Sequence, residues 1–275
     1  MFASSLSSLA STILRGARHR ARSWLPAGPT EAELPHEWRA WLNEHVQLRT
    51  RLPEALRSQH ETLVMKFLAE KPFIGCAGLE VTEQMRVVIA GYACLLVLSR
   101  GMRAYSHVRE ILVYPGAFVA RRTSTGAGGL VHEHMQVLRG ESSSLGQVVL
   151  SWEDVLTPTG FGHNLVIHEF AHQLDQAKGA ANGAPFTFAS KPQRQRWAKV
   201  MSREFEQHQR NASFGEQTLL SHYGATSPAE FFAVCSEVFF ELPRAMRYVH
   251  PALYKELNQY YRLSPADWFA STPLS

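Results

Sequence analysis

The chain has 275 residues, of which 45% are hydrophobic and 19% charged, as is ordinary for one soluble globular domain. No segment approaches the roughly 18 consecutive apolar residues of a membrane-spanning helix, so no membrane span is predicted. The net charge of +4 is modest, and no basic patch with interleaved aromatic residues indicates direct nucleic-acid binding. The three cysteines are too scattered for a disulfide framework or a thiolate zinc site, and free thiols fit a reducing compartment.

The N-terminal segment differs in composition from the rest of the chain. No acidic residue occurs before Glu31, and arginines cluster between residues 15 and 22. This Ser-rich, Arg-rich composition resembles an organelle transit peptide, and the alternative is a mobile basic extension. A secretory signal would place its positive charges before the apolar run, which is not the order here. We interpret residues 1–30 as a mobile basic arm and residues 31–275 as a single domain.

Along that domain the sequence predicts helices, then a few strands, then helices. Helical signals cover residues 31–69 and 81–102, and further helices are predicted at 193–210, 228–241 and 251–261. Strands are predicted at 111–119, where a Pro-Gly turn interrupts the run, and at 130–138 and 147–152. The last two are expected to form a hairpin. This order predicts an α+β, helix-dominant fold with a small β-sheet or hairpin beside a central helix.

The central helix carries the clearest functional motif, NLVIHEFAHQLD at residues 164–175. Asn164 is a favourable N-cap, and the apolar residues after it recur with helical period. His168 and His172 are four residues apart, so two imidazoles on one face can bind one ion at about 2.0–2.1 Å. Glu169 projects about 100° around the helix from His168 and can reach a metal-bound water. This is the H-E-x-x-H pattern of metallopeptidases, and the alternative is a surface helix with two solvated histidines.

A catalytic zinc site also needs a third protein ligand. The continuation H-E-x-x-H-x-x-G-x-x-H is absent, because Asp175 and Lys178 stand at the Gly and third His positions. Glu230 and Glu237 lie on a predicted helix that is apolar nearly all round, where a carboxylate needs a cation or strong hydrogen bonds. They are seven residues apart and share a face, so periodicity does not choose between them. Residues 227–230 are also typical of a capping box, which would give Glu230 a purely local role.

Longer stretches carry a resemblance to a known family. They run from about residue 75 to 262 and read ILVYPGAFV, GLVH, VVLSW, NLVIHEFAHQLD and YGATSPAEFFAVCSEVFFELP. In these stretches the chain resembles the MtfA family of zinc peptidases, named for the factor that titrates the sugar-responsive repressor Mlc. The metal helix is shared by many families, whereas the last stretch is specific. The family's site resembles that of the anthrax lethal factor.

The resemblance implies a zincin-like metallopeptidase domain with one Zn²⁺ per chain. By position, it implies His168, His172 and Glu230 as zinc ligands, Glu169 as the catalytic base and Tyr223 as the donor to the oxyanion. It implies a cytoplasmic peptidase that acts on peptides or proteins, with an aminopeptidase as one option. It also implies binding of an Mlc-like transcriptional repressor. The alternative is a repressor-sequestering protein whose zinc site is vestigial or weakly active. A metal hydrolase of non-peptide amides also stays open.

Two further carboxylates are candidates for residues that contact the metal ligands without binding the metal. Asp175 lies seven residues after His168 on the same face, so we predict that it accepts an N–H from a ligand histidine. The alternative for Asp175 is a carboxylate at the end of the helix that faces solvent. Glu237, if it is not the third ligand, is expected to tune the site through such a contact.

Overall fold

The computed structural model describes residues 33–125, 131–138, 140–142, 145–156, 162–177, 179, 181–185 and 190–269. The chain divides into two units, Met1–Pro35 and His36–Ser275, and the second unit carries the fold described below. The predicted basic arm, residues 1–30, lies outside the described residues. Among the helices of the described residues, none combines the length and apolar character that a membrane crossing requires.

The first half of the unit is helical, with α2 (His36–His45), α3 (Gln47–Thr50), α4 (Glu54–Glu70) and α5 (Glu83–Leu95). Helix α5 begins where the Thr82 hydroxyl accepts the N–H of Met85 at 3.3 Å. It is buried on nearly every side because α2, α4 and α7 pack around it. The helix is shorter than the one predicted over 81–102, because the chain turns at residues 96–100 and continues into η1 (Met102–Tyr105).

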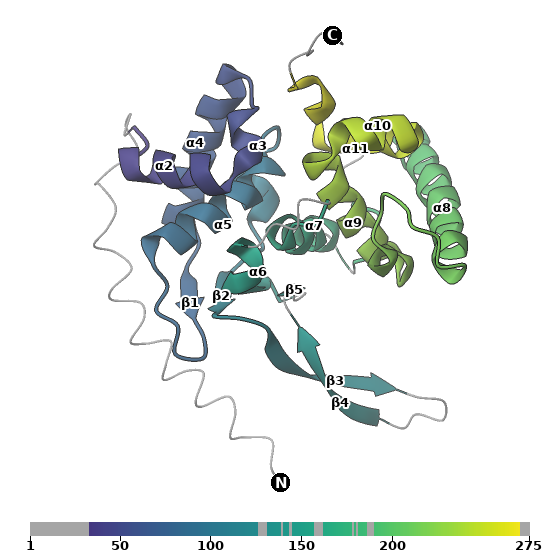
Figure 1. Ribbon diagram of the computed structural model, residues 1–275, viewed down its shortest axis with the longest axis horizontal. Coiled ribbons are helices and arrows are strands. Elements are labelled where there is room, and N and C mark those ends of the chain that lie inside the picture. The colour runs from purple at the N-terminus through teal and green to yellow at the C-terminus, as the bar shows by residue number, and fades with distance from the viewer. Residues whose placement is uncertain are drawn as a thin grey trace. The chain divides into compact units, whose positions relative to one another are not determined.

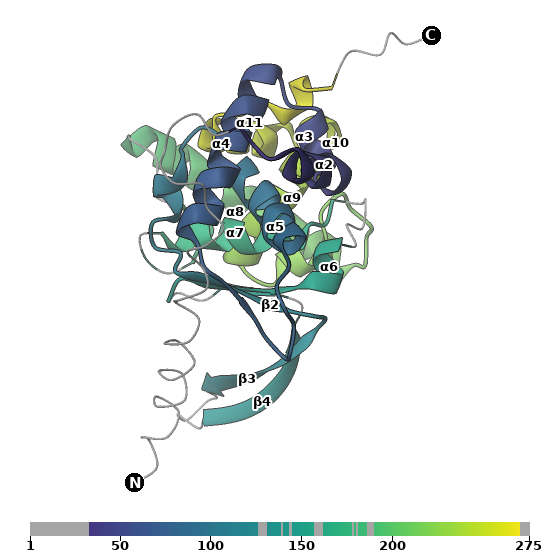
Figure 2. The same cartoon turned by 90° about the vertical axis from the view of Figure 1, so that its left-hand side faces the viewer.

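A four-stranded sheet in the order β1-β2-β6-β5 lies below the helices in Figure 2. Strands β1 (Phe73–Gly75), β2 (Glu110–Tyr114) and β6 (Gln147–Ser151) are parallel, and the short strand β5 (Gly140–Ser142) is antiparallel to β6. In the described part of the sheet, β5 is an edge strand. Helix α7 contacts both β5 and β6.

Strands β3 (Phe118–Thr125) and β4 (Val131–Leu138) form a separate antiparallel ribbon. The ribbon extends away from the sheet and the helices (Figures 1 and 2). The predicted hairpin between residues 130–138 and 147–152 is therefore wrong. Val148 and Leu150 of β6 are fully buried, and a strand buried in this way belongs inside a parallel sheet, beside β2.

The second half contains α6 (Trp152–Leu156), α7 (Leu165–Gln176), α8 (Lys191–Ser213), η2 (His222–Ala225), α9 (Pro228–Glu241), α10 (Pro243–Val249), α11 (Pro251–Tyr261) and η3 (Pro265–Asp267). The three helices predicted after residue 190 are confirmed as α8, α9 and α11. Phe170 of α7 packs against Phe67 and Tyr105, with ring centroids 5.7 and 5.1 Å apart, so α7 is anchored in the first half's core. The α+β, helix-dominant, zincin-like fold is confirmed.

Candidate metal centre

Helix α7 forms as its sequence predicts. The Asn164 side chain caps it by accepting the N–H of Ile167 at 3.0 Å. Ile167, Phe170 and Ala171 are fully buried on the face toward the core. His168 and His172 therefore share a different face, which is turned toward α9.

Helix α9 begins with a cap that also aims Glu230. The Ser227 hydroxyl accepts the backbone N–H of Glu230 at 3.2 Å, and Pro228 occupies the first turn. The Glu230 carboxylate does not complete a capping box. Its Oε2 atom lies 2.9 Å from Nε2 of His168 and 3.2 Å from Nε2 of His172. The expected cap exists, but only the backbone of Glu230 takes part in it.

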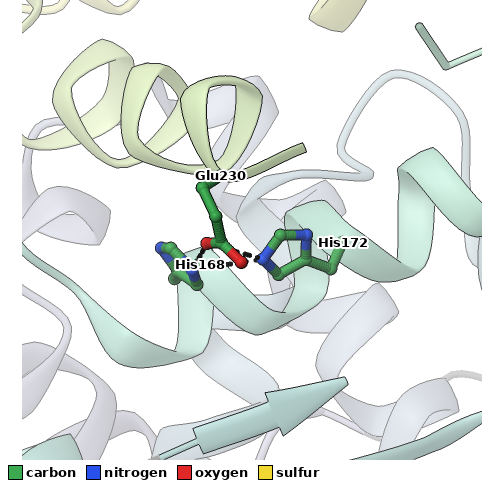
Figure 3. Close-up of side chains that lie close together, drawn as sticks. All are labelled: His168, His172 and Glu230. Carbon is green, nitrogen blue, oxygen red and sulfur yellow. Dashed lines mark hydrogen bonds and ion pairs between the residues drawn. The ribbon is translucent and has the colours of Figure 1, made fainter. Parts of the chain in front are cut away.

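The two histidines and Glu230 converge on one point. Their ligand atoms all lie within 4.8 Å of one another, and the two Nε2 atoms are 3.2 Å apart. Figure 3 shows Glu230 reaching from α9 onto both imidazoles of α7. Two imidazole nitrogens and one carboxylate are a donor set that catalytic zinc takes in proteins. Within the described residues, no other group of three such side chains comes together in this way.

Glu237 contacts the opposite side of His168. Nδ1 of His168 donates to Glu237 Oε1 at 2.7 Å, and the other oxygen of Glu237 accepts the backbone N–H of Asn164 at 2.6 Å. One carboxylate of α9 thus faces the ring nitrogen that points to the cluster, and the other fixes the ring from behind. A carboxylate on the second nitrogen of a ligand histidine sets the tautomer and orientation of the ring.

The carboxylates and histidines shift one another's ionisation. Burial alone lowers the pKa of His168, but hydrogen bonds to Glu230 and Glu237 raise it well above its ordinary value. Burial alone raises the pKa of Glu230, but hydrogen bonds from His168 and His172 hold it well below its ordinary value. Glu169 is buried, and burial raises its pKa to about 7, against the lowering effect of the two histidines.

Tyr223 lies on the turn η2, beside His168. Their ring centroids are 5.8 Å apart, and 54% of Tyr223 is exposed to solvent. The turn is held by Ser221, whose hydroxyl accepts the Tyr223 N–H at 3.4 Å. Nε2 of His208, on α8, donates to the Ser221 carbonyl at 2.9 Å. Tyr223 is therefore placed next to the cluster on a fixed turn with one side open to solvent.

Asp175 is buried at 2% exposure, so the alternative of a solvent-facing carboxylate is wrong. Its Oδ2 atom accepts the backbone N–H of Gly183 at 2.7 Å, and its Oδ1 atom has no hydrogen-bond partner among the described residues. The predicted hydrogen bond from a ligand histidine is thus not among its contacts. Asp175 interacts with the ligand residues through the charge of His172, which opposes the rise that burial causes in the pKa of this carboxylate.

The contacts of α7 with β5 are not indicated by the sequence. Gln173 is fully buried and donates through Nε2 to the Ser142 hydroxyl at 2.6 Å. Gly140, two residues earlier on β5, lies against the Glu169 carboxylate. A glycine inside a strand is itself a signal of close approach, but the sequence does not say what approaches it.

The sequence profile of the glucose-regulated metallopeptidase M90 family matches residues 18–262, which is most of the chain. The chain belongs to this family. The M90 match covers every residue of the cluster, as well as Glu169, Tyr223, Glu237 and Asp175. As a member of a metallopeptidase family the protein is expected to hold a metal, and His168, His172 and Glu230 offer a fitting donor set.

Relatives of this M90 chain extend over nearly its full length. An uncharacterized protein of Synechocystis sp. is 38% identical over 236 residues, or 84% of this chain and 86% of the relative. Mlc titration factor A of Yersinia pestis is 32% identical over 251 residues, or 88% of this chain and 90% of the relative. The protein of the same name from Yersinia pseudotuberculosis matches to the same extent.

Proposed function

We propose that this protein is a zinc-dependent peptidase in which His168, His172 and Glu230 bind the metal. The observation that carries the proposal is the convergence of these three side chains within 4.8 Å. The hydrogen bond from Nδ1 of His168 to Glu237 supports it, because this bond turns Nε2 toward the cluster. Zinc bound there would supply Lewis-acid activation of a water and of the scissile carbonyl.

Glu169 and Tyr223 are proposed to perform the proton transfer and the charge stabilisation. Glu169 follows a ligand histidine in the helix but is not one of the three clustered side chains, so its carboxylate is available as a base. It would accept a proton from the attacking water and later deliver it to the leaving amine. Tyr223, beside His168, would donate a hydrogen bond to the oxygen that becomes negative in the transition state.

A peptide substrate is favoured over a non-peptide amide by the edge strand next to the site. Strand β5 pairs with β6 on one side only in the described sheet, and its Gly140 lies against Glu169. An extended peptide can bind such an edge through main-chain hydrogen bonds. Cleavage at the N-terminus of the peptide, as by an aminopeptidase, is one form of this activity, and aminoacyl p-nitroanilides test for it.

We also propose that the protein acts in the cytoplasm and binds an Mlc-like transcriptional repressor. The name of the Yersinia relatives, Mlc titration factor A, supports this partner. The second candidate function is a repressor-binding protein whose zinc site is weakly active or vestigial. A repressor of this type that binds the protein in size-exclusion chromatography, together with a zinc-loaded wild type that cleaves no peptide, would favour that second candidate.

The direct test of the peptidase is Glu169→Gln. Wild type and variant are compared for zinc per chain and for turnover of aminoacyl p-nitroanilides and internally quenched peptides. The amide keeps the shape of the carboxylate but cannot take a proton, so we expect normal zinc and a turnover lower by about 10²- to 10⁴-fold. The matched control is Glu206→Gln, at an exposed glutamate of α8, which should change neither quantity. Near-wild-type turnover in Glu169→Gln contradicts the assignment of the base.

A further inference from the structure

Gly140 is a residue of strand β5 that lies against the helix of the metal cluster. It pairs with Leu150 of β6 in the antiparallel register, and α7 packs on both strands. Its backbone is that of a β-strand and lies outside the left-handed region that favours glycine. A glycine at this position is therefore not required by backbone conformation.

The space around Gly140 leaves no room for a side chain unless its neighbours move. A Cβ atom added there would lie 2.4 Å from Oε1 of Glu169 and 2.6 Å from Cδ1 of Leu165. Real Cβ atoms essentially never approach other atoms below 3.0 Å, so the Glu169 carboxylate and the end of the Leu165 side chain, or else the strand itself, would have to move. The Glu169 carboxylate and the Leu165 side chain thus occupy the place that a side chain at Gly140 would fill, directly beside the β5 backbone.

Contacts further along the strand keep β5 in this position. Ser142 is two residues from Gly140 and so lies on the same face of the strand. Its hydroxyl accepts a hydrogen bond from Gln173 at 2.6 Å, and its carbonyl accepts one from Gln176 at 3.4 Å. Glu169, Gln173 and Gln176 are spaced i, i+4 and i+7, so one stripe of α7 docks on β5. The strand cannot withdraw from Glu169 without breaking these bonds.

We propose that Gly140 is a positioning residue, whose missing side chain lets the β5 backbone hold the Glu169 carboxylate in place beside the two histidines. This inference rests on the proposed role of Glu169 as the base. A base must be held within a fraction of an ångström of its working position, and a displacement of about 1 Å can lower a rate about 10²-fold. Gly140 would act on the rate only through Glu169.

The test is Gly140→Ala in the zinc-loaded full chain, assayed on the peptide that the wild type cleaves best. We expect kcat to fall at least about tenfold, with zinc content unchanged and KM within about twofold. The matched control is Gly116→Ala, where the added Cβ would meet a single atom, Oε2 of Glu153, at 3.0 Å. That variant should keep the wild-type kcat. Wild-type kcat in Gly140→Ala overturns the proposal.

Two double variants separate positioning from simple loss of stability. In the Glu169→Gln background, Gly140→Ala should leave the residual rate unchanged, whereas multiplying losses would show that Gly140 acts by another route. Gly140→Ala combined with Leu165→Val relieves the apolar contact but not the contact with the carboxylate. If Gly140→Ala lowers the melting temperature, we expect the double variant to restore the melting temperature without restoring kcat. Restoration of both contradicts the proposal. If Glu169→Gln alone keeps full activity, the proposed function itself fails, which is a different outcome from an active Gly140→Ala.

Discussion

His60 and His168 are two buried histidines of this fold with different surroundings. His60 lies on α4 and is completely buried, and its Nε2 donates to the backbone carbonyl of Gly91 at 2.7 Å. Its Nδ1 has no partner among the described residues. Burial therefore dominates and lowers the pKa of His60 to about 4, so this histidine is a neutral core residue at ordinary pH.

His168, by contrast, has a carboxylate at each ring nitrogen. Glu230 lies 2.9 Å from Nε2 and Glu237 lies 2.7 Å from Nδ1. These partners reverse the effect of burial, and the pKa of His168 lies well above its ordinary value. The comparison shows that burial does not distinguish a structural histidine from one that can hold a metal. The number and charge of its partners do.

The largest expected effects come from removing a histidine of the metal cluster, with a substitution of the core histidine His60 as the comparison. His168→Ala and His172→Ala should lose zinc and all measurable peptide turnover, because a site with two ligands holds zinc poorly. His60→Gln should keep both and lose about 1–3 kcal/mol of unfolding free energy, since it disturbs one buried hydrogen bond. Zinc per chain and urea unfolding measure the difference. Stoichiometric zinc in His168→Ala, or zinc loss in His60→Gln, would contradict the distinction between a metal-binding and a structural histidine.

Tyr223→Phe should have a smaller effect on catalysis and none on the metal. The ring of Tyr223 packs near His168, and phenylalanine keeps this contact while removing the hydroxyl donor. Losing one donor to a developing oxyanion lowers kcat by about 10²- to 10³-fold. The control is Tyr248→Phe, at a tyrosine of α10 that is 88% exposed. An unchanged kcat in Tyr223→Phe would remove the tyrosine from the mechanism.

The smallest effect concerns stability against pH and isolates His60. Its pKa is about 4 in the folded protein and about 6.5 when unfolded. Between pH 6.5 and pH 4 the imidazole of His60 is protonated in the unfolded state but mostly neutral in the folded state. The free energy of unfolding therefore falls as the pH drops toward 4. At pH 5 the loss is about 2 kcal/mol. Urea unfolding from pH 7 to 5 should show a shallower decline in His60→Gln than in wild type, and equal slopes would count against the comparison.

The sequence predicted those parts of the site that one helix determines. Residues 164–176 carry their own cap, apolar face and histidine pair, so α7 could be derived locally. The separate roles of Glu230 and Glu237 could not be derived locally, because both residues lie on one face of α9. Only the packing of α9 on α7 decides which carboxylate meets which nitrogen of His168.

Strand pairing and the environment of Glu169 were beyond local reasoning for a similar reason. The runs at 130–138 and 147–152 have hairpin spacing, but burial of β6 between β2 and β5 decides its partners. Gly140 lies 29 residues before Glu169 in the sequence, and nothing near it indicates a carboxylate neighbour. Asp175 was recognised as a carboxylate of the site's helix, but its partner, Gly183, comes from the following loop.

The two carboxylates of α9 are proposed to have different tasks, with Glu230 binding the metal and Glu237 holding His168 from the other side. The most direct test is the zinc affinity of Glu230→Gln and Glu237→Gln, measured by competition with a chelator, with Glu206→Gln as the control. We expect Glu237→Gln to weaken zinc by about 10- to 100-fold at most, as for other partners of ligand histidines, and Glu230→Gln to weaken it considerably more. Zinc that is lost from Glu237→Gln but retained by Glu230→Gln would contradict this assignment of the two carboxylates.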